Sequence, residues 1–414
     1  MNYRYLLITL ALFLPGALPQ ETRLGLAPLL EEARANNREI LAAQKRLEAA
    51  RQRPVQSSAL PEPVLSLGYT SNGSPRPVAG LGAEPTSNAG VSVSQEFPFP
   101  GKRKLRGEIA GREAAAELEQ YRSVERSVLS RLRQGYHRLH HGYAAIEILE
   151  RNRDLLVRFI RIAEVRYAVG RAAQQDVLKA QTQLAILETR ILKMDQDKQS
   201  AEAEVNTLLD RPPGSPLARP ADIAPGELKV TLGDLYARAR RDAPLLRREQ
   251  RMIEGAELAV NLARKDFYPD YTVSAGYFNQ GRLADMYQFR VDFRLPSWYW
   301  GKQRSAVAEK AAQLQEARRN YEAANQFLNF KLKDDYLAAQ TSFRLMEMYS
   351  KTVVPQAALA LESSIPGYET GAVDFLSLLT NFITVVEYEL NYHEEMLNFH
   401  LALARLEERT GLAL

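Results

Sequence analysis

The sequence predicts a mainly α-helical protein with a membrane-embedded β-sheet portion, and three observations lead to this fold class. Four short segments alternate apolar and polar residues with a period of two, which is typical of strands. Two very long segments place apolar residues at steps of three and four, which is typical of coiled-coil helices. The whole arrangement occurs twice, with a period of about 200 residues, so the chain is an internal duplication.

The start of the chain has the pattern of a secretory signal peptide, which we assign to residues 1–20. Arg4 precedes an apolar run, Tyr5 to Leu14, that is too short to span a bilayer. The chain has no cysteine, which excludes disulfides, thiol catalysis and a lipid-anchored N-terminal cysteine. No later stretch approaches the roughly eighteen apolar residues of a transmembrane helix.

Charge and motifs exclude several function classes. The 54 basic and 50 acidic residues nearly balance and are interspersed along the predicted helices, so we expect no nucleic-acid partner. The Gly-Lys pairs at Gly101 and Gly301 lack the upstream glycine of a phosphate-binding loop. No metalloprotease motif or serine elbow is present. We therefore expect no enzyme activity, no catalytic residue and no cofactor.

The duplication divides the mature chain into two structural repeats joined by a linker. Each repeat contains a helix, then a β-hairpin, then a long helical hairpin. The first repeat covers residues 21–210, the linker rich in proline and glycine covers 211–230, and the second repeat covers 231–414. The opening helices are expected from Leu26 to about Gln56 and from Leu232 to about Asp266, and the β-hairpins at about 64–97 and 271–295.

The segment from Tyr287 to Leu295 shows the strand alternation most clearly. One face carries only apolar residues: Tyr287, Phe289, Val291, Phe293 and Leu295. The other face carries three charges, on Arg290, Asp292 and Arg294. This alternation fits a strand of a membrane β-barrel with its apolar face toward lipid. A soluble hairpin with one buried face is the alternative, but the long helices leave little sequence to cover that face.

Four strands cannot close a barrel alone, because the smallest membrane barrels have about eight. An open sheet in lipid would leave unpaired backbone groups that cost several kcal/mol each. The chain is therefore expected to oligomerise. Two copies would give eight strands and a filled interior, and three copies would give twelve strands with room for a pore.

Each β-hairpin ends in an unusual segment that we call a collar: "QEFPFPGKRKLR" (95–106) and "FRLPSWYWGKQR" (293–304). Aromatic rings belong at the bilayer interface, proline ends a strand, and glycine permits a sharp change of course into a helix. The lysines that follow would then face water and headgroups. The predicted membrane-interface residues are Phe97, Phe99, Gly101 and Lys102 in the first collar, and Trp298, Trp300, Gly301 and Lys302 in the second.

Long antiparallel helical hairpins are predicted after both collars. The first arm runs from Leu105 toward Tyr167, which at 1.5 Å per residue gives about 65 residues and roughly 100 Å. It turns near Gly170 and returns from Gln174. The second hairpin is expected at about 305–350 and 374–408, with Pro355 and Pro366 kinking the approach to its bend.

Histidines form one further cluster that bears on chemistry. His137, His140 and His141 fall on one face of a predicted helix, where a transition metal could bridge them. No carboxylate-rich cluster accompanies them, so we interpret them as polar positions on a solvated face. His393 and His400 receive the same interpretation, and no metal site is predicted.

Three segments, in this order and spacing, resemble the TolC-like outer-membrane efflux proteins, especially their metal and drug efflux branch: "SQEFPFPGKRKLR", "RYAVGRAAQQDVLKAQTQL" and "LLDRPPGSPL". The resemblance covers nearly the whole mature chain. It implies a homotrimer whose strands form a twelve-stranded barrel in the outer membrane of a Gram-negative-type envelope. Below that barrel, the helical hairpins would form an α-barrel that extends into the periplasm.

The same resemblance implies a passive export duct of a tripartite efflux system. Its partners would be outer-membrane lipid, a periplasmic adaptor protein and an inner-membrane pump of the RND type. Two alternatives remain at this point. One is an outer-membrane duct of a type I protein secretion system, and the other is a soluble periplasmic coiled-coil scaffold.

The resemblance also assigns roles to residues at the two bends. Those that would contact the adaptor are Val169, Gly170 and Arg171 in the first bend, and Thr370, Gly371 and Ala372 in the second. The aspartates after the bends, Asp176 and Asp374, are similar to the carboxylates that line the closed periplasmic entrance of the family.

The strand facing can be tested by placing arginine on either face. Val291→Arg should block membrane assembly, because a charge on the lipid face near the midplane costs about 2–4 kcal/mol per copy. Asp292→Arg is the matched control and should assemble normally, since its side chain points to the polar side. Membrane fractionation measures both variants, and equal behaviour would contradict the predicted facing.

Overall fold

The computed structural model describes residues 23–72, 75–223, 226–296 and 299–412, so the predicted signal peptide lies outside the described residues. The contacts divide the chain into two compact units that each combine segments of both repeats. Unit 1 contains Leu132–Glu227 and Arg344–Leu397 with the segment before Ala33. Unit 2 contains Ala33–Arg131, Leu228–Phe343 and the chain from Asn398 onward.

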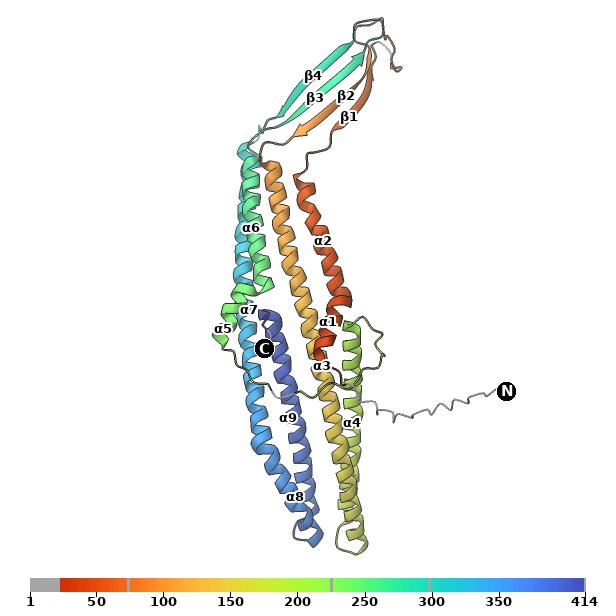
Figure 1. Ribbon diagram of the computed structural model, residues 1–414, viewed down its shortest axis with the longest axis vertical. Coiled ribbons are helices and arrows are strands. Elements are labelled where there is room, and N and C mark those ends of the chain that lie inside the picture. Colours follow the sequence, from red (N-terminus) through yellow and green to blue (C-terminus); the bar gives the residue numbers. More distant parts are fainter. Residues whose placement is uncertain (1–22, 73–74, 224–225, 297–298, 413–414) are drawn as a thin grey trace, which may run out of the picture. The chain divides into compact units, whose positions relative to one another are not determined.

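Unit 2 contains a four-stranded antiparallel sheet in the order β1-β2-β3-β4 (Figure 1). The strands are β1 (Val64–Thr70), β2 (Asn88–Phe97), β3 (Asp270–Asn279) and β4 (Met286–Arg294). Both predicted hairpins are therefore confirmed. The pairing of β2 with β3 joins the two repeats in the middle of the sheet, and β1 and β4 form its edges.

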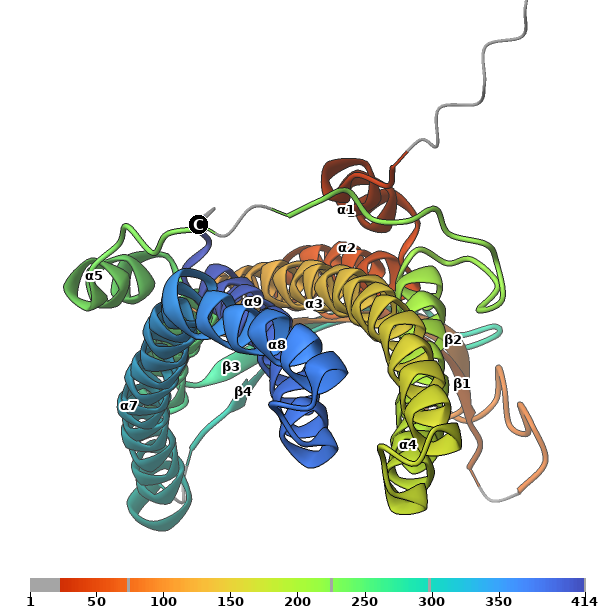
Figure 2. The same ribbon diagram turned by 90° about the horizontal axis from the view of Figure 1, so that it is seen from below.

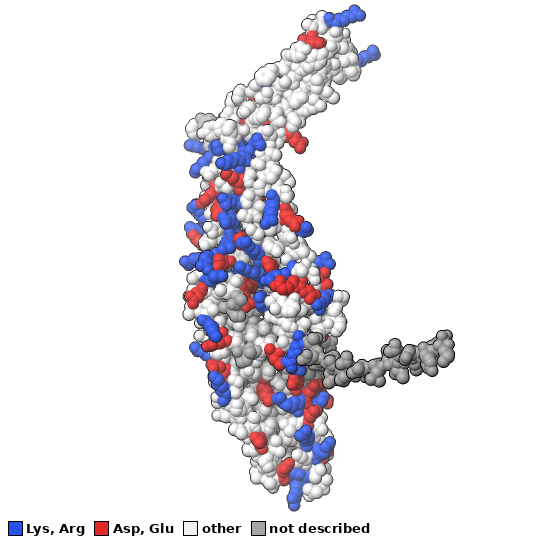
Figure 3. Space-filling model, in the orientation of Figure 1, with Lys and Arg blue, Asp and Glu red and all other residues white. Residues whose placement is uncertain are grey.

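The strand register places most of the apolar residues of all four strands on one face. Side chains directly opposite each other in an antiparallel ladder share a face. Phe97 lies opposite Tyr271, which lies opposite Phe293, and this row runs across three strands. A second row runs across all four strands, through Leu65, Val93, Ala275 and Phe289. On the side drawn in Figure 3, most of the visible charged side chains lie on the helices and few lie on the strands.

The opposite face of the sheet is mostly small and polar, and it accommodates one large ring. Phe278 lies opposite Gly90 in the ladder. A Cβ atom at Gly90 would lie 2.4 Å from the Phe278 ring and 2.2 Å from the Tyr277 carbonyl oxygen. Glycine is therefore required at this position, because the Phe278 ring covers the site where a side chain would stand.

The helices that open the two repeats each break once, where the sequence predicted a continuous helix. The four pieces are α1 (Leu26–Asn36), α2 (Arg38–Ser58), α5 (Leu232–Asp242) and α6 (Pro244–Lys265). The first break is at Asn37, whose side chain accepts hydrogen bonds from the N–H groups of Glu39 and Ile40. The second is at Pro244, which lacks an N–H and begins a new helix readily.

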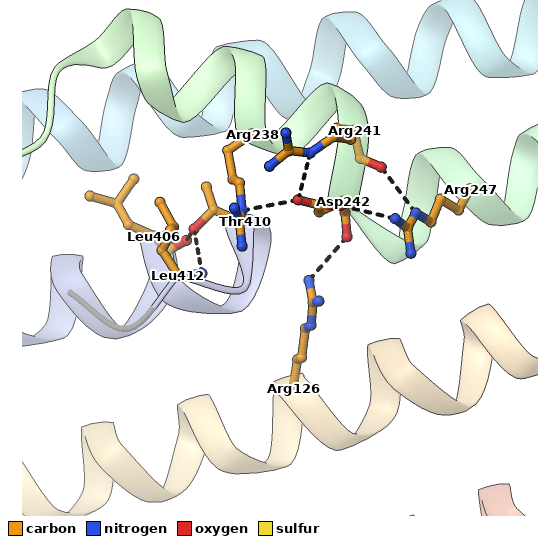
Figure 4. Close-up of polar contacts among 8 residues, drawn as sticks. All are labelled: Arg126, Arg238, Arg241, Asp242, Arg247, Leu406, Thr410 and Leu412. Carbon is orange, nitrogen blue, oxygen red and sulfur yellow. Dashed lines mark hydrogen bonds and ion pairs between the residues drawn. The ribbon is translucent and has the colours of Figure 1, made fainter.

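An arginine cluster in unit 2 surrounds the break between α5 and α6 (Figure 4). The Asp242 carboxylate pairs with Arg238 at 3.0 Å, Arg241 at 3.1 Å and Arg247 at 2.9 Å. Arg126, from α3, donates to the Asp242 carbonyl oxygen at 3.4 Å. The hydrogen bond from Arg241 and the nearby guanidinium charges hold the pKa of Asp242 below its usual value. The break is thus fixed by charge as well as by the proline.

Unit 1 contains the ends of two antiparallel helical hairpins, as predicted. The hairpin helices are α3 (Lys102–Ala168), α4 (Gln174–Leu208), α7 (Arg304–Met348), α8 (Val354–Thr370) and α9 (Phe375–Thr410). In unit 1, α3 lies beside α4, and α8 lies beside α9 (Figures 1 and 2). The hairpins share one apolar core, in which Phe159 and Phe382 meet edge to face at 5.7 Å.

The second hairpin contains an interruption that matches a predicted kink. A π-helical turn, Tyr349–Val353, separates α7 from α8 directly before Pro355. Proline cannot donate to the helix ladder, which explains the irregular turn at this point. Pro366, by contrast, lies inside α8 without ending it.

The described helices all fall short of the apolar length that crossing a bilayer requires.

The linker is hydrogen-bonded to the start of the described chain in unit 1. Leu24 donates to the Arg219 carbonyl at 2.9 Å, and Ala221 donates back to the Leu24 carbonyl at 3.0 Å. Tyr136 adds a hydroxyl hydrogen bond of 2.8 Å to the same Leu24 oxygen.

A buried carboxylate joins α7 to the end of α9 in unit 2 and provides a stability test. The Asp335 side chain is 6% exposed and accepts from Arg405 at 2.6 Å and Arg409 at 2.8 Å. Asp335→Ala should destabilise each chain by about 3–5 kcal/mol, because it leaves two guanidinium groups without their buried partner. Thermal loss of helical circular dichroism in detergent measures the effect. The exposed neighbour Asp334 is the control, and a similar loss for Asp334→Ala would contradict the assignment.

Candidate functional site

The first collar is built around a buried ion pair. The Lys102 side chain is only 4% exposed, and its Nζ lies 2.9 Å from Asp270 Oδ1 and 3.2 Å from Asp266 Oδ1. The Phe99 N–H donates to the same Asp270 oxygen at 2.7 Å. The prediction that Lys102 faces water is therefore wrong. Asp270, at the start of β3, supplies its counter-charge from the other repeat.

Aromatic stacking and one glycine complete this collar. Phe97 stacks on Tyr271 with ring centroids 5.4 Å apart, and Phe99 stacks on Tyr268 at 4.5 Å. Gly101 has a φ of +91°, which side chains rarely adopt, so the predicted role of glycine in the turn is confirmed here. The collar thus fixes the end of β2 and the start of α3 against the second repeat.

The second collar is built differently. Trp298 lies outside the described residues. The Trp300 side chain is 65% exposed, with the Arg304 guanidinium 4.8 Å above its ring. Gly301 lies in a π-helical turn, Tyr299–Gln303, and does not adopt a left-handed conformation, so its predicted role as a turn glycine is wrong. Lys302 is exposed. The placement of both collars at a membrane interface stays a prediction.

The apolar face of the sheet is open to the surroundings of the chain. Tyr287 is 78% exposed, Phe289 is 73% exposed and Leu67 is 78% exposed. A contiguous apolar surface of this kind marks an interaction with a membrane or a partner. The backbone groups on the outer sides of β1 and β4 face no further strand in the described chain.

The two hairpin bends carry the same helix cap. After α3, Gly170 has a φ of +72° and its N–H donates to the Tyr167 carbonyl at 2.9 Å. The Arg171 N–H reaches back to the Arg166 carbonyl at 2.8 Å. This pair of hydrogen bonds is the Schellman motif, which satisfies carbonyls left free at a helix end.

The bend after α8 repeats this geometry. Gly371 has a φ of +86°, and its N–H donates to the Tyr368 carbonyl at 3.1 Å. The Ala372 N–H donates to the Gly367 carbonyl at 2.8 Å. Gly170 and Gly371 are therefore structural counterparts, and Val169 and Thr370 beside them are both exposed. Their contact with an adaptor stays a prediction.

Arg166 links the two bends and was not singled out from the sequence. Its guanidinium donates to the Tyr368 carbonyl and, at 3.0 Å, to the Glu369 carbonyl. It also lies 4.6 Å above the Tyr368 ring. These carbonyls belong to the last turn of α8, where helix ends favour a cation. The available signal was the pair of motifs "RYAVG" and "GYETG", which contain both residues.

The two predicted gate aspartates occupy different positions. Asp374 immediately precedes α9 and caps it, since its carboxylate accepts from the Ser377 N–H at 2.9 Å and the Ser377 hydroxyl at 2.8 Å. These hydrogen bonds hold the pKa of Asp374 below its usual value. The corresponding position before α4 is Ala173, and Asp176 lies within the first turn of that helix. Asp374 is therefore not the structural counterpart of Asp176.

Asp176 is half-buried, and its charge acts on Tyr368. Burial raises the pKa of the Tyr368 hydroxyl, the Asp176 charge raises it further, and the Arg166 charge opposes them. Tyr368 itself is 3% exposed. Arg166, Tyr368 and Asp176 therefore form one electrostatic group at the end of the hairpins.

The histidines are half-buried rather than fully solvated, which corrects the interpretation made from the sequence. Burial lowers the pKa of His140 and of His141. Burial, with the charges of His141 and His140, lowers the pKa of His393 to about 4. In the described ranges, no group of three or more His, Asp, Glu or Cys side chains could hold a metal ion.

Long capped hairpins, an exposed apolar sheet face and open sheet edges together define a class, that of a subunit of a membrane channel. Comparison with known proteins agrees. The family described as "Outer membrane efflux protein" matches residues 29–211 and 235–412. The chain therefore belongs to the outer membrane efflux protein family, and it is an outer-membrane efflux channel of a Gram-negative bacterium.

Individual relatives are distant but cover most of the chain. The pyoverdine export outer membrane protein OpmQ of Pseudomonas aeruginosa is 24% identical over 93% of this chain and 83% of its own length. The cobalt-zinc-cadmium resistance protein CzcC of Cupriavidus metallidurans is 21% identical over 89% of this chain and 85% of its own. The crystal structure of CusC superposes with a TM-score of 0.80 at 17% identity, covering 97% and 96% of the two chains. This likeness confirms the predicted fold class.

Proposed function

We propose that three copies of the chain assemble into a passive duct of a tripartite efflux system. The observation that carries this proposal is the sheet, which presents a largely apolar, exposed face and two open edges in a single chain. In lipid, such edges must be paired, because unsatisfied backbone groups cost several kcal/mol each. Three copies of four strands provide a closed wall with an open interior.

The hairpin tips are the proposed docking points for a periplasmic adaptor. The exposed residues are Val169, Gly170 and Arg171 at one tip, and Thr370, Gly371 and Ala372 at the other. A Cβ atom at Gly170 would meet nothing within 4 Å, so a partner backbone can approach this point closely. An inner-membrane pump of the RND type is the proposed third component.

The cargo is selected by the pump in this proposal, and the duct only conducts. The names of the two relatives support this division: one names pyoverdine, and the other names cobalt, zinc and cadmium. These cargoes differ in size and charge, although both relatives match most of this chain. A duct without a specific cargo site accounts for both.

The proposal can be tested at the first tip with Gly170→Val. A β-branched residue is strained at a φ of +72°, by roughly 1–2 kcal/mol, and its side chain fills the surface left for a partner. We expect normal amounts of membrane-inserted trimer but loss of efflux, measured as cell survival on zinc and on ethidium. Gly214→Val is the matched control, because Gly214 also has open space around it and no left-handed conformation. Full efflux by Gly170→Val would contradict the docking role of the tip.

The entrance can be tested separately with Asp176→Asn. Three copies of Asp176 around a narrow opening would favour cations and repel anions. We expect weaker cation selectivity and less block by divalent ions in planar-bilayer recordings. Asp374→Asn is the comparison, because asparagine keeps the cap of α9 while removing the charge. If neither variant changes selectivity or block, these carboxylates do not line the entrance.

A further inference from the structure

Because the chain is an internal duplication, the junction between its two repeats is a guide to the junction between two copies of the chain. Within a single chain, the end of the first repeat's hairpin meets the start of the second repeat's hairpin, where β2 pairs with β3. Lys102 after β2 is joined there to Asp270 at the start of β3, with 2.9 Å between Nζ and Oδ1. In a closed ring, β4 of one copy would pair with β1 of the next copy in the same way as β2 pairs with β3 within one chain.

The sequence supplies counterparts for both members of this ion pair. The segment Pro61-Glu62 precedes Gly68-Tyr69 at the same spacing as Pro269-Asp270 precedes Gly276-Tyr277, so Glu62 takes the place of Asp270. The second collar ends in Gly301-Lys302 as the first ends in Gly101-Lys102, so Lys302 takes the place of Lys102.

Both counterparts lack a partner within one copy. Glu62 and Lys302 are exposed, and neither forms an ion pair with any residue that the structure describes. Lys102, in contrast, is almost completely buried. The ion pair between Lys102 and Asp270 thus forms where the two repeats meet, whereas its counterparts Lys302 and Glu62, at the two outer edges of the same sheet, form no such pair within the described chain.

We propose that Lys302 of one copy pairs with Glu62 of the next copy, where β4 pairs with β1 to close the ring. This inference rests on the proposed trimer. It adds the residues and the strand register of the seam, by which we mean the contact between β4 of one copy and β1 of the next. The occupant of each sheet edge is therefore a second copy of this chain, and the contact runs head to tail around the ring.

The same equivalence fixes the strand register of the seam. Phe97 lies opposite Tyr271 within the chain, and their counterparts by alignment of the repeats are Leu295 and Pro63. With Leu295 opposite Pro63 of the next copy, the other rows follow: Phe293 with Leu65, Val291 with Leu67, Asp292 with Ser66, and Arg290 with Gly68.

This register continues both faces of the sheet without a break. Apolar residues meet apolar residues on the lipid side. On the other side polar residues meet small or polar ones, except that Arg294 faces Val64 at the end of the strands. The Arg290 side chain would stand opposite Gly68, where a Cβ atom meets nothing within 4 Å. A slip by one residue would place Asp292 beside Leu65 or Leu67, which opposes charge to the apolar face.

The second collar is two residues longer between its proline and its glycine. Its π-helical turn, Tyr299–Gln303, accommodates inserted length before α7 begins. Lys302 keeps its position directly after the collar glycine, and its long side chain is free to turn toward the neighbouring strand.

The register can be tested by cross-linking, because the natural chain has no cysteine. Residues directly opposite in a ladder have Cα atoms about 4.5–5.5 Å apart, within disulfide reach, whereas diagonal neighbours are about 7–8 Å apart. The full chain carrying Ser66→Cys with Asp292→Cys should form dimers and a covalent trimer when oxidised in membranes. Ser66→Cys with Arg290→Cys is the control and should link several-fold less.

The ion pair is tested by charge reversal. Glu62→Lys alone and Lys302→Glu alone should each lower the fraction of SDS-resistant trimer several-fold, and the double reversal should restore it. If the Ser66→Cys, Asp292→Cys variant assembles as a trimer but does not cross-link, or if the double charge reversal gives no rescue, the proposed β4–β1 contact is overturned and the proposed duct stays intact. A wild-type chain that is monomeric in detergent would overturn the proposed function itself.

Discussion

The pairing of Lys102 with Asp270 is the constraint on which the arrangement of unit 2 depends. An ammonium group that is 4% exposed must have a counter-charge, because removing one partner of a buried pair costs several kcal/mol. Asp270 meets this need and also accepts the Phe99 N–H at 2.7 Å. One carboxylate therefore fixes the end of the first hairpin, the start of α3 and the first residue of β3.

Joining the repeats at this point has a consequence for the sheet. Once β2 is held beside β3, the strands left at the edges are β1 and β4, one from each repeat. Their side chains are exposed along their whole length, including large apolar ones such as Tyr287 and Leu67. With β2 and β3 joined in the middle, β1 and β4 each keep one edge unpaired within the described chain, which is the property of a subunit rather than of a finished sheet.

Much of this fold could be predicted from the sequence, because its signals are local. The alternation from Tyr287 to Leu295 and the helical periodicity after each collar depend only on neighbouring residues. The burial of Lys102 could not be predicted, since its partner lies 168 positions away. The role of Arg166 could not be predicted for the same reason, because its acceptors are the carbonyl oxygens of Tyr368 and Glu369 in the other repeat. The prediction of a turn glycine at Gly301 was wrong because Gly301 shares the Gly-Lys motif of Gly101 but not its left-handed backbone conformation.

The two tips show how a duplicated backbone can carry unlike chemistry. Gly170 and Gly371 end their helices with the same pair of hydrogen bonds, so the chain path is the same at both. The charges around them differ: no lysine or arginine occurs between Lys351 and Arg405, whereas the first tip carries Arg166 and Arg171. A partner that recognises the shared backbone would meet both tips alike, but one that recognises charge would distinguish them. The shared backbone would therefore allow one partner to make the same contact at both tips, and side-chain charge would be the feature by which a partner could tell the two tips apart.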